Sequence, residues 1–413
     1  MSHSRLGRLV AAVLLAACAA EPGTSSPASS GSVAGTTATS PTATSPTARD
    51  PTATDSPTSS TAAPSPSTTM PVDATAQYTV GALPATGGCH LDPPSADGQV
   101  TFVVGNRLYG IASNGIPQCL ADLKSRSPDW LSWSPDGDEL LAGPDMLLRA
   151  NGTMTTTGYF ADNTNVRWSA PTGKALLAPK ASTGQLIWRN AHNSAERIDV
   201  SFADNITSAA YHPAGKHIAV AGIGRDGQGP GVFVASNRGA NARRIGQLEP
   251  GTTATDVAFE MEGNSIIFVH AHQNGGAHLH RWDFANGLQT LADLPGVTPT
   301  DLTVSQVDQG DIAWTQSYPT VKSISRVLVN GSTEPLVIGV PEAERVTAPI
   351  GWMPGHRLLV SSRSPDRGTS PFDIWEWSPT GMRLVIAGVT AAAARLIHGH
   401  YDELTIIPGA GFG

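Results

Sequence analysis

Short apolar runs separated by turn-forming residues fill the chain beyond residue 81. Two examples are the runs at 100–104 and 265–269, and Gly, Pro, Asn and Asp stand between such runs. Runs of this length that are bounded by turn residues are typical of short β-strands. The pattern therefore predicts an all-β fold for this part of the chain.

A composite unit recurs within this pattern: a large, mostly aromatic side chain, then a turn containing Gly or Pro, then a second apolar run. The residues that mark successive copies are spaced about 35 to 48 positions apart. These markers are Trp133, Trp168, Tyr211, Phe259, Val304, Trp352 and His398. A period of this length predicts a β-propeller, whose four-stranded antiparallel blades need neighbours to bury their faces.

The number of copies predicts the number of blades. Six complete copies begin near residues 131, 166, 209, 257, 302 and 350. Partial copies stand before them, at 100–111, and after them, at 396–407. Because an unpaired sheet edge invites aggregation, we expect the strand at 396–398 to pair with strands from 100–112 in a seventh blade. Six blades with an end cap is the alternative.

The best copy, Trp-Ser-Pro-Asp-Gly at 133–137, resembles the repeat of the TolB family of β-propellers. The resemblance covers roughly residues 97–413. It implies a propeller that binds proteins or ligands at its faces. The likeness is to the repeat and not to the whole TolB protein, because that family has a folded domain where this chain has a low-complexity segment.

The N-terminus has the pattern of an export signal. Arg5 and Arg8 precede an apolar stretch at 9–17, which is far shorter than the roughly 20 residues of a membrane-spanning helix. Leu-Ala-Ala-Cys at 15–18 resembles the bacterial lipobox. The resemblance implies cleavage before Cys18, diacylglycerol on its sulfur, and an anchor at the extracytoplasmic face of the cell membrane. An ordinary secretory signal with an incidental cysteine is the alternative.

These features divide the chain into three parts. Residues 1–17 are the lipoprotein signal peptide, 18–78 are the lipidated cysteine and a tether, and 79–413 are the propeller domain. The tether is almost entirely Ser, Thr, Pro, Ala and Gly, so it has too little apolar surface to offset the entropy of folding and is predicted to be disordered. Cys89 and Cys119 form an even pair in an exported protein, which predicts a disulfide; two buried free thiols are the alternative.

The net charge and the absence of catalytic motifs limit the classes of function that the sequence supports. A formal net charge of −8 without a basic patch argues against nucleic acid as a partner. The sequence has no Gly-x-Ser-x-Gly, Walker loop, His-Glu-x-x-His or dinucleotide fingerprint. We therefore expect a non-enzymatic binding or scaffold protein of the cell envelope, with envelope proteins or cell-wall ligands as partners and no cofactor. A propeller enzyme, a lyase or hydrolase with its site in the central channel, is the alternative.

A second alternative is metal binding by a histidine-rich hairpin. His270 and His272 alternate on one predicted strand, and His278 and His280 alternate on the next, so each pair lies on one face. A turn centred on Asn-Gly-Gly at 274–276 would place His272 opposite His278 and His270 opposite His280. Four imidazoles on one face could share Zn²⁺ or Cu²⁺. The competing interpretation is a polar hairpin with ordinary hydrogen bonds; His398 and His400 form a lesser pair.

Overall fold

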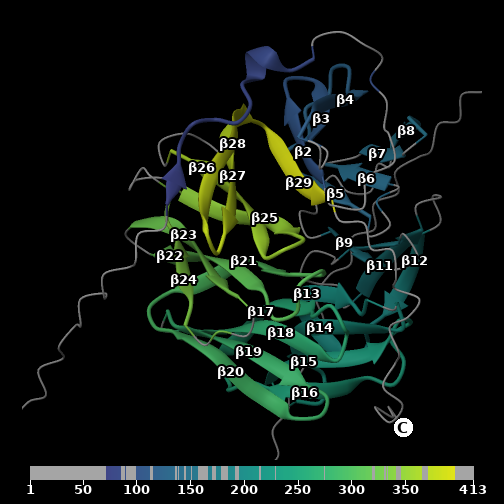
Figure 1. Ribbon diagram of the computed structural model, residues 1–413. Coiled ribbons are helices and arrows are strands. Elements are labelled where there is room, and N and C mark those ends of the chain that lie inside the picture. Colours follow the sequence, from purple (N-terminus) through teal and green to yellow (C-terminus); the bar gives the residue numbers. More distant parts are fainter. Residues whose placement is uncertain are drawn as a thin grey trace, which may run out of the picture. The chain divides into compact units, whose positions relative to one another are not determined.

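The computed structural model is a β-propeller with seven sheets among the residues it describes (Figure 1). These are residues 71–84, 89, 99–111, 115–134, 137, 139–143, 146–149, 151–156, 166–169, 174–177, 185–190, 195–213, 215–227, 229–273, 275–318, 321–329, 332, 334–340, 346–364 and 371–395. Cys18, His398 and His400 lie outside the described residues. Within them, no helix has the length and apolar character needed to cross a membrane.

Six blades are continuous in the sequence, and the strands of each pair antiparallel in chain order. Blade 1 contains β5 (Leu131–Trp133), β6 (Glu139–Ala142), β7 (Met146–Arg149) and β8 (Met154–Thr156). Blade 2 contains β9 (Val166–Ser169), β10 (Lys174–Leu177), β11 (Gln185–Asn190) and β12 (Ala195–Asp199). Blade 3 contains β13 (Ala203–Tyr211), β14 (His217–Gly224), β15 (Gly229–Ser236) and β16 (Arg243–Gln247).

The next three blades have the same antiparallel order. Blade 4 contains β17 (Thr252–Phe259), β18 (Ser265–His272), β19 (Ala277–Asp283) and β20 (Gly287–Leu294). Blade 5 contains β21 (Thr298–Val304), β22 (Ile312–Tyr318), β23 (Val321–Leu328) and β24 (Leu336–Ile338). Blade 6 contains β25 (Val346–Met353), β26 (Arg357–Arg363), β27 (Phe372–Ser378) and β28 (Gly381–Val389).

The seventh, closing blade joins the two ends of the domain. Its order is β29 (Ala391–Arg395), β2 (Gln99–Val104), β3 (Arg107–Ile111) and β4 (Pro117–Asp122), and Figure 1 shows the yellow β29 beside the blue β2. The seven-blade prediction is therefore confirmed. The strand that pairs with β2 is Ala391–Arg395, with Ala391 opposite Val103, and residues 396–398, which we expected there, lie outside the described residues.

Neighbouring blades share the hydrophobic core. The marker side chains Trp133, Phe259 and Trp352 are buried in clusters that combine residues of two adjacent blades, where large aromatic rings contribute much of the buried apolar area. The first strands of blades 2 to 6 contact one another in succession, and β29 contacts both β25 and β5. These neighbouring blades therefore pack against each other along their first strands.

An N-terminal strap, residues 71–84 with Cys89, lies against blade 6 and the closing blade. Strand β1 (Val72–Asp73) adds to the outer strand β28 in parallel, and Tyr78 bridges to Ile386. The Tyr78 hydroxyl donates to the Gly115 carbonyl of the closing blade at 2.5 Å. The structure therefore places residues 71–78, which the sequence analysis assigned to the tether, on the folded domain.

The change of composition explains this correction. The Ser/Thr/Pro/Ala repeat ends before Val72 and Tyr78, and these side chains are large enough to stabilise contacts with a sheet edge. Beyond them, Leu83 is buried with residues of blade 6 and the closing blade. The strap ends at the predicted disulfide, in which Cys89 is bonded to Cys119 of β4 and the two Cα atoms are 4.8 Å apart.

Candidate functional site

The four histidines singled out in the sequence lie together on the hairpin of β18 and β19. His270 pairs with His278, and Phe268 pairs with His280, so all four imidazoles share one face as predicted. The predicted register is wrong by two residues, because the turn closes between His272 and Gly276, one position earlier than a turn at 274–276 would close. The His272 amide donates to the Gly276 carbonyl at 2.7 Å, and Gly275 has φ of 85°, a left-handed conformation that suits glycine.

The imidazole rings contact one another, but two of their nitrogen atoms have no hydrogen-bond partner. Ring centroids are 4.5 Å apart for His270 and His272, 4.7 Å for His272 and His278, and 5.8 Å for His270 and His278. Within the described part of the chain, the Nε2 atoms of His270 and His272 are buried and have no hydrogen-bond partner. Burial, followed by repulsion from the neighbouring imidazoles, lowers the pKa of His270 to about 4. The ring of His270 is therefore neutral near pH 7 and has a free lone pair.

Strand β20 holds the other two rings. His278 Nδ1 lies 2.5 Å from Asp293 Oδ1. His280 Nδ1 lies 3.3 Å from Thr290 Oγ1, while its Nε2 faces His270 Nδ1 at 3.4 Å. Burial, and next the charge of His278, lowers the pKa of His280.

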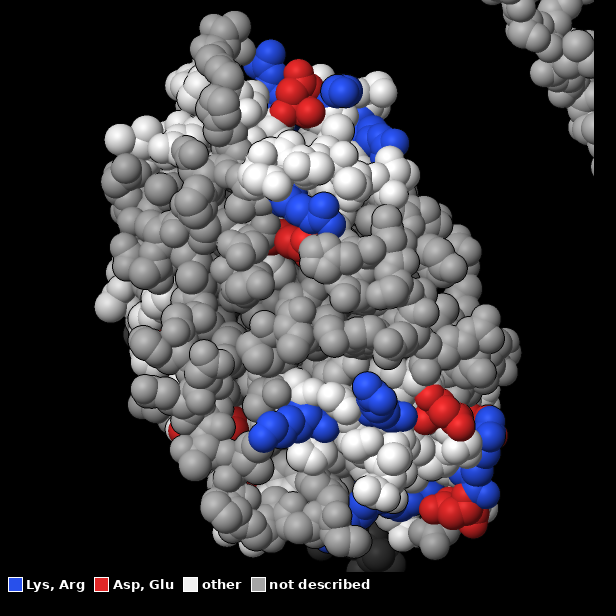
Figure 2. Space-filling model, turned by 90° about the vertical axis from the view of Figure 1, so that its right-hand side faces the viewer, with Lys and Arg blue, Asp and Glu red and all other residues white. Residues whose placement is uncertain are grey.

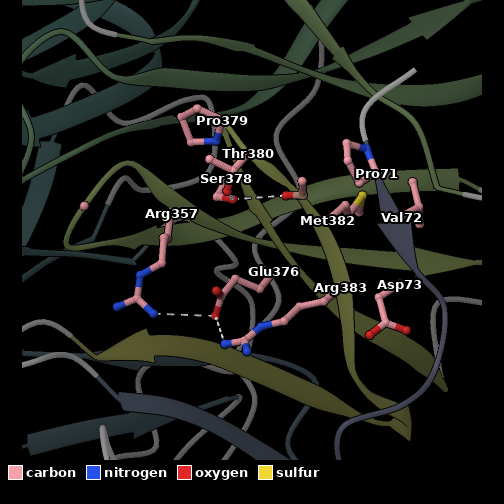
Figure 3. A pocket seen from close by; sticks show the side chains of 12 residues that line it. Pro71, Val72, Asp73, Arg357, Glu376, Ser378, Pro379, Thr380, Met382 and Arg383 are labelled. Atoms are coloured by element: carbon pink, nitrogen blue, oxygen red, sulfur yellow. Dashed lines mark hydrogen bonds and ion pairs between the residues drawn. The ribbon is translucent and has the colours of Figure 1, made fainter. Parts of the chain in front are cut away.

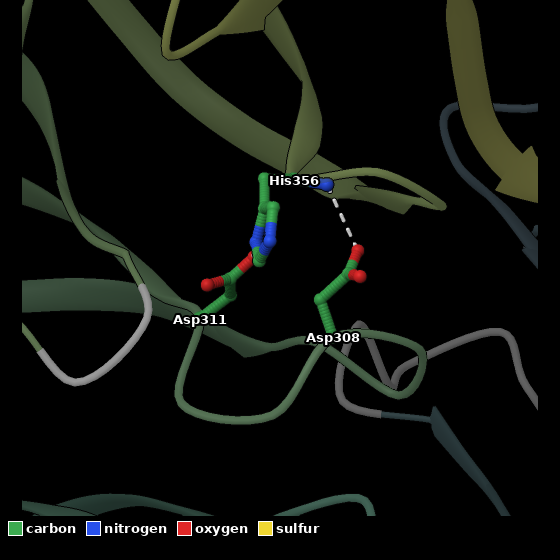
Figure 4. Close-up of side chains that lie close together, drawn as sticks. All are labelled: Asp308, Asp311 and His356. Atoms are coloured by element: carbon green, nitrogen blue, oxygen red, sulfur yellow. Dashed lines mark hydrogen bonds and ion pairs between the residues drawn. The ribbon is translucent and has the colours of Figure 1, made fainter.

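A second cluster, Asp308, Asp311 and His356, is formed by the first turns of blades 5 and 6 (Figure 4). His356 Nδ1 lies 2.7 Å from Asp311 Oδ2, and the His356 amide donates to Asp308 Oδ2 at 2.9 Å. Their ligand atoms lie within 4.8 Å of one another, and they form the one group of three such side chains found among the described residues. This set could hold a metal ion, and the sequence analysis missed it.

The position of His356 also fits a purely structural role between blades. The hydrogen bond to the fully buried Asp311 raises the pKa of His356. Equivalent turns make comparable contacts: the His212 ring of blade 3 packs on Gly263 of blade 4, and Gln306 Nε2 of blade 5 donates to the Phe259 carbonyl of blade 4 at 3.0 Å. We name the Asp308–Asp311–His356 group the blade 5–6 latch.

Polar side chains on the first strands are also engaged. The described first strands carry the carboxylates Asp204, Asp256 and Asp301. Asp256 accepts hydrogen bonds from the Ser208 hydroxyl of blade 3 and the Leu302 amide of blade 5. Asp301 accepts a hydrogen bond from Thr300 at 3.1 Å. Asp204 accepts from Arg225 at 2.6 Å, and this bond lowers its pKa.

An open cavity of about 790 Å³ lies where the strap joins blade 6 (Figure 3). Pro71, Val72 and Asp73 line it on the strap side. On the blade side Glu376 lies 3.1 Å from Arg383 Nη2 and 3.7 Å from Arg357 Nη1. With Asp73, the lining carries two acidic and two basic side chains, so the net charge of the cavity is zero.

Charges of both signs are interspersed on the surface. On the face shown in Figure 2, described acidic and basic side chains lie beside one another. Ion pairs such as Arg225–Asp204 and Arg244–Asp226 account for part of this mixing.

No family model and no curated protein matches the sequence. Among solved structures, a prolyl endopeptidase is 10% identical over 75% of this chain, with a TM-score of 0.48, and the match spans about half, 52%, of that chain. An oligogalacturonate lyase in complex with manganese is 14% identical over 65% of this chain and 82% of its own, with a TM-score of 0.48. TolB from Acinetobacter baumannii is 16% identical over 71% of this chain and 68% of its own, with a TM-score of 0.35. Because all three TM-scores are below 0.5, these likenesses carry no argument about function, and the function of this chain has to be argued from its own residues.

Proposed function

We propose that the chain is an exported lipoprotein whose propeller binds a partner in the cell envelope without catalysing a reaction. Cys18 carries the lipid that holds it at the extracytoplasmic face of the cell membrane. Two acyl chains suffice for stable anchoring, because each buried CH₂ contributes roughly 0.8 kcal/mol. The partner is an envelope protein or a cell-wall ligand.

The non-enzymatic part of this proposal rests on the hydrogen bonds that the carboxylates of the first strands make. A general acid that works near neutral pH needs a raised carboxyl pKa, whereas the bond from Arg225 lowers the pKa of Asp204. The two carboxylate oxygens of Asp256 accept hydrogen bonds from the two neighbouring blades. Asp256 therefore links neighbouring blades, Asp204 is paired within blade 3, and β29, the first strand of the closing blade, contains four alanines.

The path of the strap supports a role in binding. The strap pairs with the outer strand β28, so the chain leading to Cys18 meets the domain at the outside of blade 6.

Exposed apolar side chains occur on several blades, including Ile116, Ile223, Leu288 and Leu336. A partner that covers one of these positions would bury apolar area that is now in water.

The anchor is tested by replacing Cys18 in the full chain. In a bacterial host that processes lipoproteins, the wild-type chain should fractionate with membranes and lose residues 1–17. Cys18→Ser should retain the signal peptide and take up no labelled fatty acid. Membrane retention of a processed Cys18→Ser chain would contradict the lipid anchor.

Binding is tested by site-specific photo-crosslinking in the same cells. A photoreactive residue is placed in turn at 116, 223, 288 and 336, which lie on four different blades. A partner bound to one surface should give a discrete adduct from some positions and not from others. The proposal fails if no position gives an adduct, or if all four give the same unspecific smear.

A further inference from the structure

We propose that the β18–β19 hairpin is a binding site for a transition-metal ion of the imidazole-preferring class, Zn²⁺ or Cu²⁺. The ligands are the Nε2 atoms of His270, His272 and His278, with His280 and Asp293 behind them. The site is independent of the binding function proposed above, so either proposal can fail alone.

The unpartnered nitrogens are the first argument. Leaving a buried acceptor without a partner costs about 1–3 kcal/mol. Here two such atoms, Nε2 of His270 and Nε2 of His272, belong to adjacent rings. The His270 side chain is only 6% exposed, so bulk water has little access to it. A metal ion at this point would satisfy both nitrogens at once.

The outer partners are the second argument. Metal-binding histidines usually donate the other ring N–H to a carboxylate, a carbonyl or a similar acceptor, which fixes the tautomer and leaves the free nitrogen for the metal. Asp293 is such an acceptor for His278, because its Oδ1 lies 2.5 Å from His278 Nδ1. For His270 the partner is His280 Nε2, 3.4 Å from Nδ1, which accepts when His270 carries its proton on Nδ1 and thereby leaves Nε2 for the metal. His280 is held in turn by Thr290.

The spacing of the rings is the third argument. A metal about 2.1 Å from Nε2 lies roughly 3.2 Å from the ring centre, so rings at tetrahedral positions are about 5 Å apart. The three centroid distances, 4.5, 4.7 and 5.8 Å, bracket this value. The nitrogens do not yet converge to within 4.8 Å as a set of three, as those of the blade 5–6 latch do. His272 and His278 are only partly buried, so we expect these two side chains to rotate when the ion binds and to bring the three nitrogens together.

Three histidine ligands leave one tetrahedral position for water or another ligand. Imidazole suits both Zn²⁺ and Cu²⁺, and Cu²⁺ binds more tightly to a given set of nitrogen ligands. The blade 5–6 latch differs in that Asp308 and Asp311 already hold His356. The hairpin is therefore the better imidazole site of the two.

The test is titration of the metal-free full chain, purified in detergent without a polyhistidine tag, with ZnCl₂ and with CuCl₂. Calorimetry should show one equivalent of either ion, and Cu²⁺ should give an electron paramagnetic resonance spectrum with nitrogen couplings. His272→Gln and His278→Gln should weaken binding by at least 100-fold, and Asp293→Asn by about 10- to 100-fold. These partly exposed positions are chosen because a His270 variant would also disturb the core.

Two matched controls remove an imidazole elsewhere. His217→Gln, at the start of the second strand of blade 3, should leave affinity and stoichiometry unchanged. His356→Gln, in the blade 5–6 latch, should do the same. The proposal is overturned if neither ion binds at 100 µM, if His356→Gln abolishes the titrated site, or if folded His272→Gln and His278→Gln bind like the wild type.

Discussion

Removing the Cys89–Cys119 disulfide should lower the melting temperature of the domain by about 5 °C. The two cysteines are 30 positions apart, and closing a loop of that length lowers the entropy of the unfolded chain by an amount worth roughly 3.5 kcal/mol. Unfolding entropy is about 2.1 cal/mol/K per residue, or roughly 0.7 kcal/mol/K for the 325 or so residues from Pro71 to Arg395. The ratio of these quantities gives the expected shift.

This shift is expected if the strap unfolds together with the propeller. Phe102 and Tyr109, which lie inside the loop closed by the disulfide, are buried in one cluster with Leu83 of the strap, so the loop and the strap share the same core. If the strap instead detached before the blades unfolded, the loop constraint would act on an already loose segment and global stability would not change.

The assay is calorimetric melting of the full chain in three forms: oxidised, reduced, and Cys89→Ala/Cys119→Ala. The reduced form and the double variant should melt at the same temperature, about 5 °C below the oxidised form. Reductant should have no effect on the double variant. A shift below 1 °C, with thiol titration showing complete reduction, would refute the coupling of strap and propeller.

Two further predictions concern closure and the blade 5–6 latch. Deleting 391–413 should abolish cooperative unfolding and cause aggregation, because it exposes the edge of β2, whereas deleting 396–413 should leave a folded domain; equal behaviour of the two truncations by calorimetry and light scattering would contradict the role of β29. The latch bond raises the folded-state pKa of His356 above 6.5, so its stabilisation is fully present below about pH 6.5 and lost as pH rises through the raised value. His356→Gln should therefore destabilise the protein more at pH 5.5 than at pH 8.5 in urea titrations, and a difference of the opposite sign would refute this assignment.

The fold could be predicted from the sequence because each blade repeats the same local sequence pattern. An aromatic before a Gly-containing turn marks the end of the first strand, and Phe259 and Trp352 lie at those ends. The closing strand was harder to place. Residues 391–394 are all alanine and lack the large apolar side chains by which strands are recognised, so the prediction moved to the more apolar residues that follow.

The sites show a different limit of sequence reasoning. Alternation alone placed the four histidines on one face, but the register depended on where the turn closes. The His272 amide bonds to the Gly276 carbonyl, one position earlier than a turn at 274–276 would close. The blade 5–6 latch had no local signal, because His356 and Asp311 are 45 positions apart. Only the packing of one blade on the next brings them together.

The same comparison indicates where function should be sought in this propeller. Polar side chains at the first turns, such as His212 and His356, contact the neighbouring blade and so help to hold successive blades together. The histidine hairpin lies between the second and third strands of blade 4, where the repeat requires short apolar strands and a tight turn. Nothing in the packing of blades calls for imidazoles there, and burying His270 with an unpaired nitrogen opposes folding. A departure from the repeat that weakens folding, and that a bound metal ion would reverse, is better explained by a ligand than by architecture.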